Sequence, residues 1–133
     1  MKSVLAVTFE GSHVRVQSDG EKSYPFALKL WTEVGRVCRE NHCFRVLGIA
    51  KTTLPVSTLE GFDHIEIFAA AGITPEFRIA WVELNPDAFV TTRFIETVLL
   101  NRGVANVRLF SQVEPAKEWL LGSQRAEEAI SSR

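Results

Sequence analysis

The second half of the chain changes from a strand-like to a helix-like pattern of apolar residues and back again. Residues 77–82 form a nearly continuous apolar run, which is typical of a buried strand. A helix is predicted to follow, because Asn85 can cap its first turn and Pro86 has the backbone angle of a first helical residue. Gly103 predicts the end of that helix, and residues 106–110 resume a strand pattern. This succession predicts an α/β fold.

The first half of the chain predicts a hairpin, a helix and a third strand. Residues 3–9 and 13–17 have strand patterns, and residues 10–12 predict a tight turn that makes the two strands antiparallel. Apolar residues recur with the helical period over residues 25–41. Residues 44–50 are almost entirely apolar, as expected for a parallel strand covered on both faces.

Two further helices complete the predicted order of elements. Ser57 and Glu60 form a capping box for a helix that runs to about residue 71, and the last helix is expected to start near Glu114. Residues 1–122 are therefore expected to form a single α/β domain with elements in the order ββαβαβαβα. We expect a mixed sheet of about five strands, the first two antiparallel and the remainder largely parallel. Residues 123–133 are expected to be a polar tail that extends the helix or frays.

Composition and charge narrow the classes of partner. The 15 basic and 16 acidic residues are interspersed, which disfavours a nucleic-acid groove or a basic membrane patch. The apolar segment near the N-terminus is too short for a signal peptide or a membrane span, so we expect a cytoplasmic protein with no membrane insertion. Cys38 and Cys43 are expected to stay reduced and to act as small buried residues.

Two predicted helices carry apolar residues on faces that are expected to be exposed to solvent. We expect the second helix to bury a stripe consisting of Leu59, Phe62, Ile65, Phe68, Ala69 and Ile73, and the third to bury Val90, Phe94, Ile95, Val98 and Leu99. The residues expected to form a partner or dimer surface on the opposite sides are Glu60, Asp63, His64, Ile67, Phe89, Arg93, Glu96 and Leu100. Apolar anchors ringed by charge are typical of a protein interface.

Residue types that carry chemistry are present, but their spacing completes no site. Glu60, Asp63 and His64 offer too few ligands for a structural zinc ion, and the Cys38, His42 and Cys43 group is also incomplete. No glycine-rich phosphate loop and no nucleophile elbow occur in the sequence. We therefore expect no metal, no cofactor and no catalytic residues, with an uncharacterised enzyme as the third hypothesis.

The second half of the chain resembles the C-terminal half of the small bacterial SpoIIAA-like proteins. The segments that carry the resemblance are, in order, Asn85–Phe89, Glu96-Thr97-Val98, Asn101-Arg102-Gly103, Val107–Phe110 and Ala116–Leu120. That family is related in fold to STAS domains and to Sec14-type lipid-binding domains. The resemblance covers the element order of nearly the whole chain, and individual residues over about 78–120. It implies an α/β fold of the STAS type.

In STAS-type anti-sigma-factor antagonists, the corresponding third strand is followed by an Asp-Ser-Ser/Thr-Gly-like turn in which a hydroxyl is phosphorylated. Here the turn begins Lys51-Thr52-Thr53 and lacks the aspartate and the glycine. The resemblance therefore leaves four candidate regulatory hydroxyls, on Thr52, Thr53, Ser57 and Thr58. A capping role suffices to explain Ser57, and we expect it to be a structural cap rather than an essential switch.

The leading hypothesis from the sequence is a regulatory or protein-interaction module that is not an enzyme and that binds a second copy of itself or another protein. The alternative is a domain that binds a hydrophobic small molecule or lipid, suggested by the Sec14-like relationship, nine Phe and three Trp. Those aromatics mostly have core spacing, so we expect a filled interior beneath Phe62, Phe68 and Trp81, with no cavity for an acyl chain.

Overall fold

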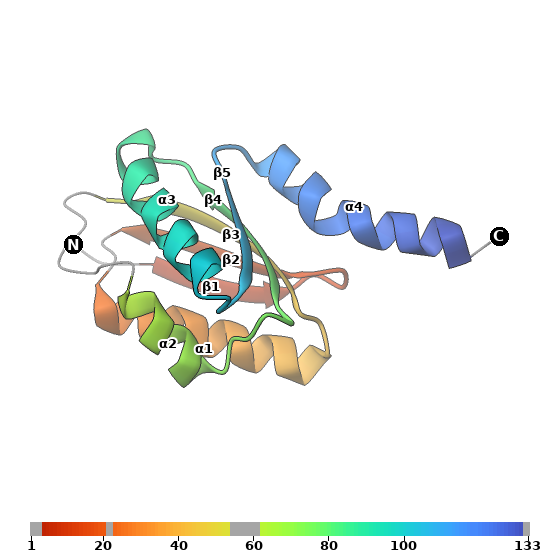
Figure 1. The fold of residues 1–133 in the computed structure, drawn as a ribbon, viewed down its shortest axis with the longest axis horizontal. Helices are drawn as coiled ribbons and strands as arrows, with labels where there is room; N and C mark the ends of the chain where they lie inside the picture. The colour runs from red at the N-terminus through yellow and green to blue at the C-terminus, as the bar shows by residue number, and fades with distance from the viewer. Residues whose placement is uncertain (1–3, 21–22, 54–61, 132–133) are drawn as a thin grey trace.

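A five-stranded mixed sheet forms the centre of the protein (Figure 1). The computed structural model describes residues 4–20, 23–53 and 62–131, with side chains as far as residue 122. The strands are β1 (Val4–Phe9), β2 (Val14–Gly20), β3 (Arg45–Thr52), β4 (Arg78–Glu83) and β5 (Asn106–Phe110). They lie side by side in chain order; β1 and β2 are antiparallel and every other neighbouring pair is parallel. The predicted α/β class, element order and mixture of strand directions are confirmed.

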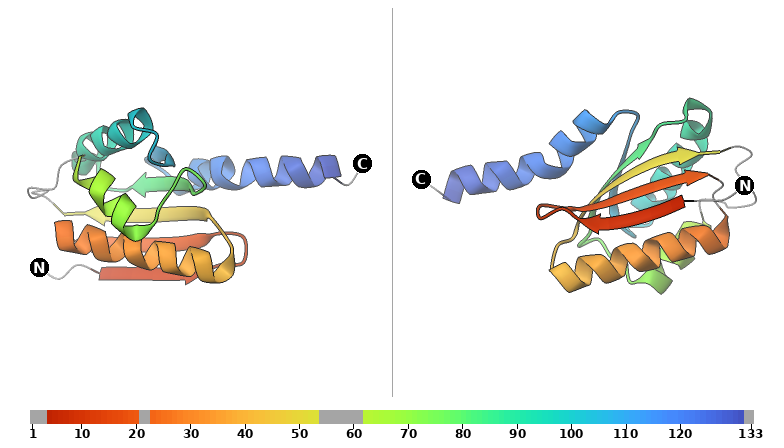
Figure 2. Two further views of the ribbon diagram at one scale, coloured as in Figure 1. Left: turned by 60° about the horizontal axis from the view of Figure 1, so that its bottom comes forward. Right: turned by 180° about the vertical axis from the view of Figure 1, so that it is seen from behind.

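The helices are α1 (Tyr24–Asn41), α2 (Asp63–Ala71), α3 (Pro86–Asn101) and α4 (Val113–Ser131). Neighbouring parallel strands taken in chain order, joined by right-handed crossovers, put their connecting helices on one face of the sheet. Accordingly α1, α2 and α3 lie together on one face, whereas α4 lies on the other (Figure 2). The segment expected to be a polar tail continues α4, which projects beyond the sheet (Figure 1).

Each face of the sheet buries its own apolar cluster. The larger cluster lies beneath α1, α2 and α3, and the smaller one beneath α4. The fully or nearly fully buried residues of the smaller cluster are Leu47, Ile49, Ala80, Val82, Ala116 and Leu120. Because β3 and β4 contribute to both clusters, these two strands are apolar on both faces, which explains their continuous apolar runs.

Side-chain caps fix where α1 and α3 begin. The Ser23 hydroxyl accepts a hydrogen bond from the Phe26 amide at 3.2 Å, and the Asn85 side chain accepts one from the Asp87 amide at 3.0 Å. Gly103 has a positive φ of 63° just after α3, as predicted for a helix end. The predicted capping box of α2 lies outside the residues that the structure describes.

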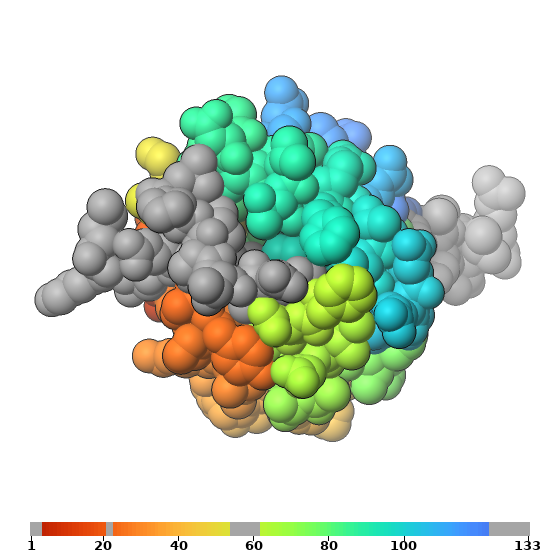
Figure 3. All heavy atoms as spheres, turned by 60° about the vertical axis from the view of Figure 1, so that its left-hand side comes forward, coloured from red at the N-terminus to blue at the C-terminus, as the bar shows by residue number. Residues whose placement is uncertain are grey.

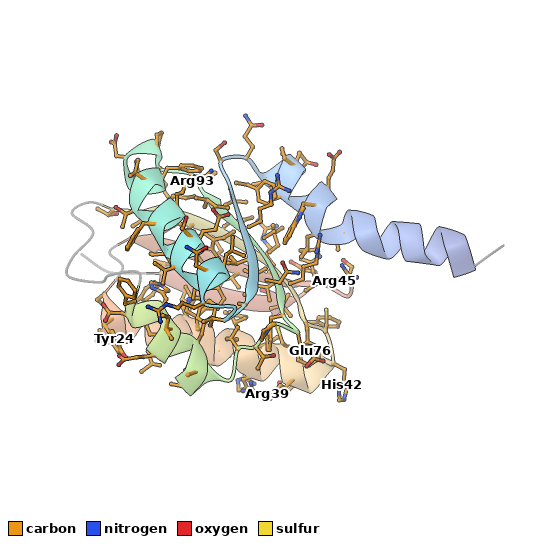
Figure 4. The ribbon with its side chains drawn as sticks, in the orientation of Figure 1. Tyr24, Arg39, His42, Arg45, Glu76 and Arg93 are labelled. Atoms are coloured by element: carbon orange, nitrogen blue, oxygen red, sulfur yellow. The ribbon has the colours of Figure 1, made fainter. Side chains whose placement is uncertain are left out.

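Contacts at both ends of α1 hold α2 against it. Near the start of α1, the Tyr24 hydroxyl donates to the Glu66 carboxylate at 3.4 Å. Near its end, Arg39 donates to the Ala71 carbonyl at 3.2 Å (Figure 4). Between them Gly35 permits close packing, since a Cβ there would lie 2.6 Å from the Ala71 carbonyl oxygen.

Two arginines at the starts of β3 and β4 attach α4 to the sheet. Arg45 donates to the Leu120 carbonyl at 2.7 Å, and Arg78 donates to the Trp119 carbonyl at 2.8 Å. The Arg78 guanidinium also stacks on the Trp119 ring, 3.8 Å from its centroid. Burial, together with the positive charges of Arg45 and Arg108, lowers the pKa of Arg78.

Candidate functional site

Large apolar side chains are exposed on the outside of α2 and α3. The two helices lie next to each other on this side of the molecule (Figure 3). Val90 is 79 % exposed, and Phe62, Phe94 and Leu100 are each about half exposed, at 51 %, 49 % and 48 %. We call these four residues, with Arg93 and Arg102, the α2–α3 surface. Single exposed apolar residues are ordinary, but a cluster of them is typical of an interaction site.

Aromatic and cationic groups are arranged together on the α2–α3 surface. The rings of Phe62 and Phe94 meet nearly edge to face, with centroids 6.2 Å apart. The Arg102 guanidinium lies 5.8 Å from the Phe62 ring, and the Arg93 guanidinium lies 5.3 Å from the Phe89 ring. Arg93 extends from α3 (Figure 4), so the surface combines exposed rings with exposed positive charge.

The predicted orientation of α3 is wrong in part. Val90 and Phe94 were expected in the core but are exposed, and the buried residues of α3 are Ala88, Ile95, Glu96, Val98 and Leu99. Thr91 and Thr92 are half-buried instead. The Thr92 hydroxyl donates to the Ala88 carbonyl at 2.9 Å, so this polar residue can face inward without an unsatisfied group. The adjacent threonines could have indicated this rotation of α3, because a threonine can face inward when its hydroxyl bonds to its own helix. The spacing of apolar residues alone does not include this signal.

Glu96 was expected on the outer face and is largely buried. Its carboxylate accepts a hydrogen bond from the backbone amide of Leu109 in β5. It also forms a longer ion pair with Arg93, at 3.4 Å. A buried carboxylate needs such donors, so Glu96 connects α3 to the last strand rather than to a partner.

The predicted orientation of α2 is also wrong in part, although Phe68 and Ile73 of the expected stripe are buried as predicted. Ile67 and His64, expected on the outer face, are buried, whereas Phe62, expected in the core, is exposed. Asp63 is partly exposed. The buried stripe of α2 is His64, Ile67, Phe68 and Ala71, which has helical spacing but includes a polar residue. A pattern of apolar residues alone places histidine outside, and the helix was therefore assigned the wrong rotation.

Leu100 lies on the surface as predicted, and Phe89 is half-buried against the core. Phe89 also lines a shallow hollow with Leu84, Pro86 and Ser111 at the carboxyl end of β4. Its ring therefore offers less area to a partner than those of Phe62 and Phe94. Glu60, the remaining residue of the predicted surface, lies outside the described residues.

The candidate regulatory hydroxyls fall into two groups. Thr52 is buried and its hydroxyl donates to the Glu83 carboxylate, so a kinase could not reach it in the folded protein. Thr53 is half-buried, and its backbone amide donates to the Gly20 carbonyl at 3.0 Å. Ser57 and Thr58 lie outside the described residues, so the predicted capping role of Ser57 and the candidate regulatory role of both hydroxyls stay hypotheses from the sequence.

A small cavity lies under α2 and α3, between aromatic residues of the core. Trp31 packs against Phe68 and Trp81, with ring centroids 4.6 and 5.2 Å away, and all three line the cavity together with His64 and Glu96. The space open to the centre of a water-sized sphere is about 30 Å³. That volume suits one or two water molecules and cannot hold an acyl chain.

The thiols differ in accessibility. Cys38 is fully buried, and burial raises the pKa of its thiol to about 12. Cys43 is only partly buried, and its thiol points to the Ser12 carbonyl, with the sulfur 3.7 Å from that oxygen. The described residues contain no group of three or more His, Cys, Asp or Glu side chains that could hold a metal ion.

Within the described part of the chain, no helix combines the length and apolar character needed to cross a membrane. No protein-family model matches the sequence, and no curated protein matches it with significant similarity. The SpoIIAA-like resemblance therefore stays a prediction beyond the α/β architecture itself.

Proposed function

We propose that the protein is an interaction module that binds a partner protein through the α2–α3 surface. The observation that carries this proposal is the exposure of Phe62, Val90 and Phe94 next to two arginines. Aromatic and arginine side chains are the residues that most often dominate binding energy at protein interfaces. Burying a phenylalanine that is half exposed removes unfavourable apolar surface from water.

The charges on this surface favour a partner of a particular kind. Arg93 lies beside the Phe89 ring and Arg102 beside the Phe62 ring, and Arg93 remains largely exposed although it forms a long ion pair with Glu96 at 3.4 Å. A symmetric contact between two copies centred on Phe94 would bring the two Arg93 side chains together, which like charges oppose. The proposed partner is therefore a different protein that presents an amphipathic segment with apolar anchors and carboxylates.

A photo-crosslinking amino acid at position 90 tests the proposal in the cells from which the sequence comes. Val90 is the most exposed large apolar residue in the part of the chain that the structure describes, so a substitution there leaves the core intact. The matched control carries the same amino acid at the exposed Gln112, on the loop before α4. We expect one defined adduct from position 90, whose partner is then purified and titrated against the unmodified chain.

Binding titrations of the purified partner against variants of this chain measure what the apolar and the charged side chains each contribute. Phe94→Glu is expected to weaken binding at least about tenfold, because it places a charge in the apolar centre. Arg93→Glu with Arg102→Glu is expected to weaken binding and to reverse its dependence on salt. Equal adducts from positions 90 and 112, or an adduct made of two copies of this chain, would overturn the proposal.

A further inference from the structure

The two outer strands of the sheet are protected differently. At one edge, the Glu96 side chain of α3 accepts a hydrogen bond from the backbone of β5, and Asn106 and Arg108 are exposed on that strand. At the other edge, β1 has the sequence Val-Leu-Ala-Val-Thr-Phe, without charge, proline or glycine. In the described part of the chain, no strand pairs with the outer side of β1. Such an edge is a template for another strand.

The side chains along this edge also remain partly uncovered. Val4 is 57 % exposed and Phe9 is 38 % exposed, although both belong to a strand. Leu5 and Val7 point to the α1 side and, with Phe26, form the apolar floor of an open groove between β1 and α1. Viewed from behind, β1 lies at the free edge of the sheet with α1 beside it (Figure 2).

The α1 side of this groove carries two opposite charges. Lys29 and Glu33 are one helical turn apart on α1, and both line the groove with the apolar residues. A twofold axis that pairs two β1 strands antiparallel also sets two α1 helices antiparallel. When the axis passes midway between the levels of Lys29 and Glu33, Lys29 of one copy faces the partner's Glu33, and Glu33 faces the partner's Lys29.

We propose that two copies of the chain associate through β1, forming one continuous ten-stranded sheet, with their α1 helices facing each other across the twofold axis. The backbone groups of β1 pair with those of the second copy, and the apolar floor of each groove closes against the other. The charge order along α1 selects this antiparallel arrangement, because it is complementary to itself. The contact is separate from the α2–α3 surface and leaves that surface free.

Charge reversal followed by rescue tests the arrangement. Lys29→Glu places a second carboxylate opposite the Glu33 carboxylate of the other copy. Glu33→Lys places a second ammonium group opposite Lys29 of the other copy. Each single variant is expected to raise the dimer dissociation constant at least about tenfold, measured by sedimentation equilibrium. The double variant Lys29→Glu/Glu33→Lys is expected to return to within about threefold of the unmodified protein, since it restores complementarity.

Glu33 also pairs with Arg36 in its own helix, so melting curves accompany each measurement. Lys29 forms no close ion pair among the described residues, but its charge acts on Glu33 one turn away in the same helix, so Lys29→Glu needs the same melting control. A third variant, Ala6→Lys, places like charges near the axis at an exposed position of β1 and is expected to abolish the dimer. Thr97→Lys on the exposed face of α3 is the matched control.

A monomeric unmodified protein at 100 micromolar would overturn the proposal. So would failure of the double variant to recover association while its melting curve is unchanged. Dissociation by Thr97→Lys or Phe94→Glu, with Lys29→Glu without effect, would instead place self-association on α3.

Discussion

Glu83 at the end of β4 holds Thr52 at the end of β3 through two hydrogen bonds. Its carboxylate accepts the backbone amide of Thr52 at 3.1 Å and also the Thr52 hydroxyl. The same carboxylate accepts the amide of Asn85 at 3.1 Å, and the Asn85 side chain donates back to the Thr52 carbonyl at 2.6 Å. Because Glu83 is almost fully buried, these bonds replace the water that its charge would otherwise need.

Removing the Glu83 carboxylate should therefore destabilise the fold in a graded way. Glu83→Leu leaves the buried amide and hydroxyl of Thr52 and the partly buried amide of Asn85 without an acceptor, and we expect a loss of about 3 kcal/mol or more in urea unfolding. Glu83→Gln keeps one oxygen for the amides, and the Thr52 hydroxyl can turn to accept from the new amide group. We expect a loss of about 1 kcal/mol for that variant. Glu76→Gln, at an exposed position, is the control and should be neutral.

Gly48 in β3 is required by the ring of Trp81, its neighbour in β4. The two residues are paired in the sheet register, and a Cβ on Gly48 would overlap the indole ring. We expect Gly48→Ala to cost at least about 2 kcal/mol, because Trp81 sits in a packed core and cannot move freely. Gly122→Ala provides the comparison, since a Cβ there meets nothing within 4 Å. If both substitutions shift the unfolding midpoint equally, the close approach has no energetic importance.

The two cysteines should react with a thiol reagent at very different rates. With its pKa raised to about 12 by burial, Cys38 has about one thiolate per ten thousand molecules at pH 8. We expect dithionitrobenzoate to modify one thiol quickly in the folded protein and the second only when the protein unfolds. Cys43→Ser should remove the fast phase, and Cys38→Ser should remove the slow one. Two equally fast thiols would contradict the burial of Cys38.

His13 should make the protein less stable in mild acid. Burial lowers the pKa of His13 below 6.5, Lys117 and Arg15 lower it further, and Glu10 partly opposes them. The unfolded chain therefore binds this proton more readily than the folded one, so stability falls as the pH drops below about 6.5. In urea unfolding at pH 7.5 and 5.5, His13→Gln should lose less stability than the unmodified protein. An equal loss of stability in His13→Gln and in the unmodified protein would show that His13 does not carry the effect.

The order of helices and strands was predictable because local signals mark it. Asn85 caps α3 and Gly103 ends it, and both signals act within a few residues of where they stand in the chain. The apolar runs of β3 and β4 likewise follow from burial on both faces. Such features need no knowledge of the distant parts of the chain.

The rotation of α2 and α3 depends on partners far along the chain and was not predictable from apolar spacing. Glu96 faces inward because the Leu109 amide, in a later strand, supplies its donor. Thr92 faces inward because its hydroxyl is satisfied within its own helix. Both helices are rotated relative to the prediction, because their buried stripes include polar residues. The candidate surface therefore consists of Phe62, Val90 and Phe94 rather than Ile67 and Glu96.

The chain order of the strands has a consequence for how the protein folds during synthesis. Each strand from β2 to β5 pairs with the strand made immediately before it. A nascent chain emerging from the ribosome can therefore add one strand and one helix at a time to a sheet that is already formed behind it. Every partial product exposes one new edge, and the next strand to be translated covers that edge. Strand pairing is thus vectorial, whereas the apolar face of β3 and β4 that packs against α4 stays uncovered until that last helix is made.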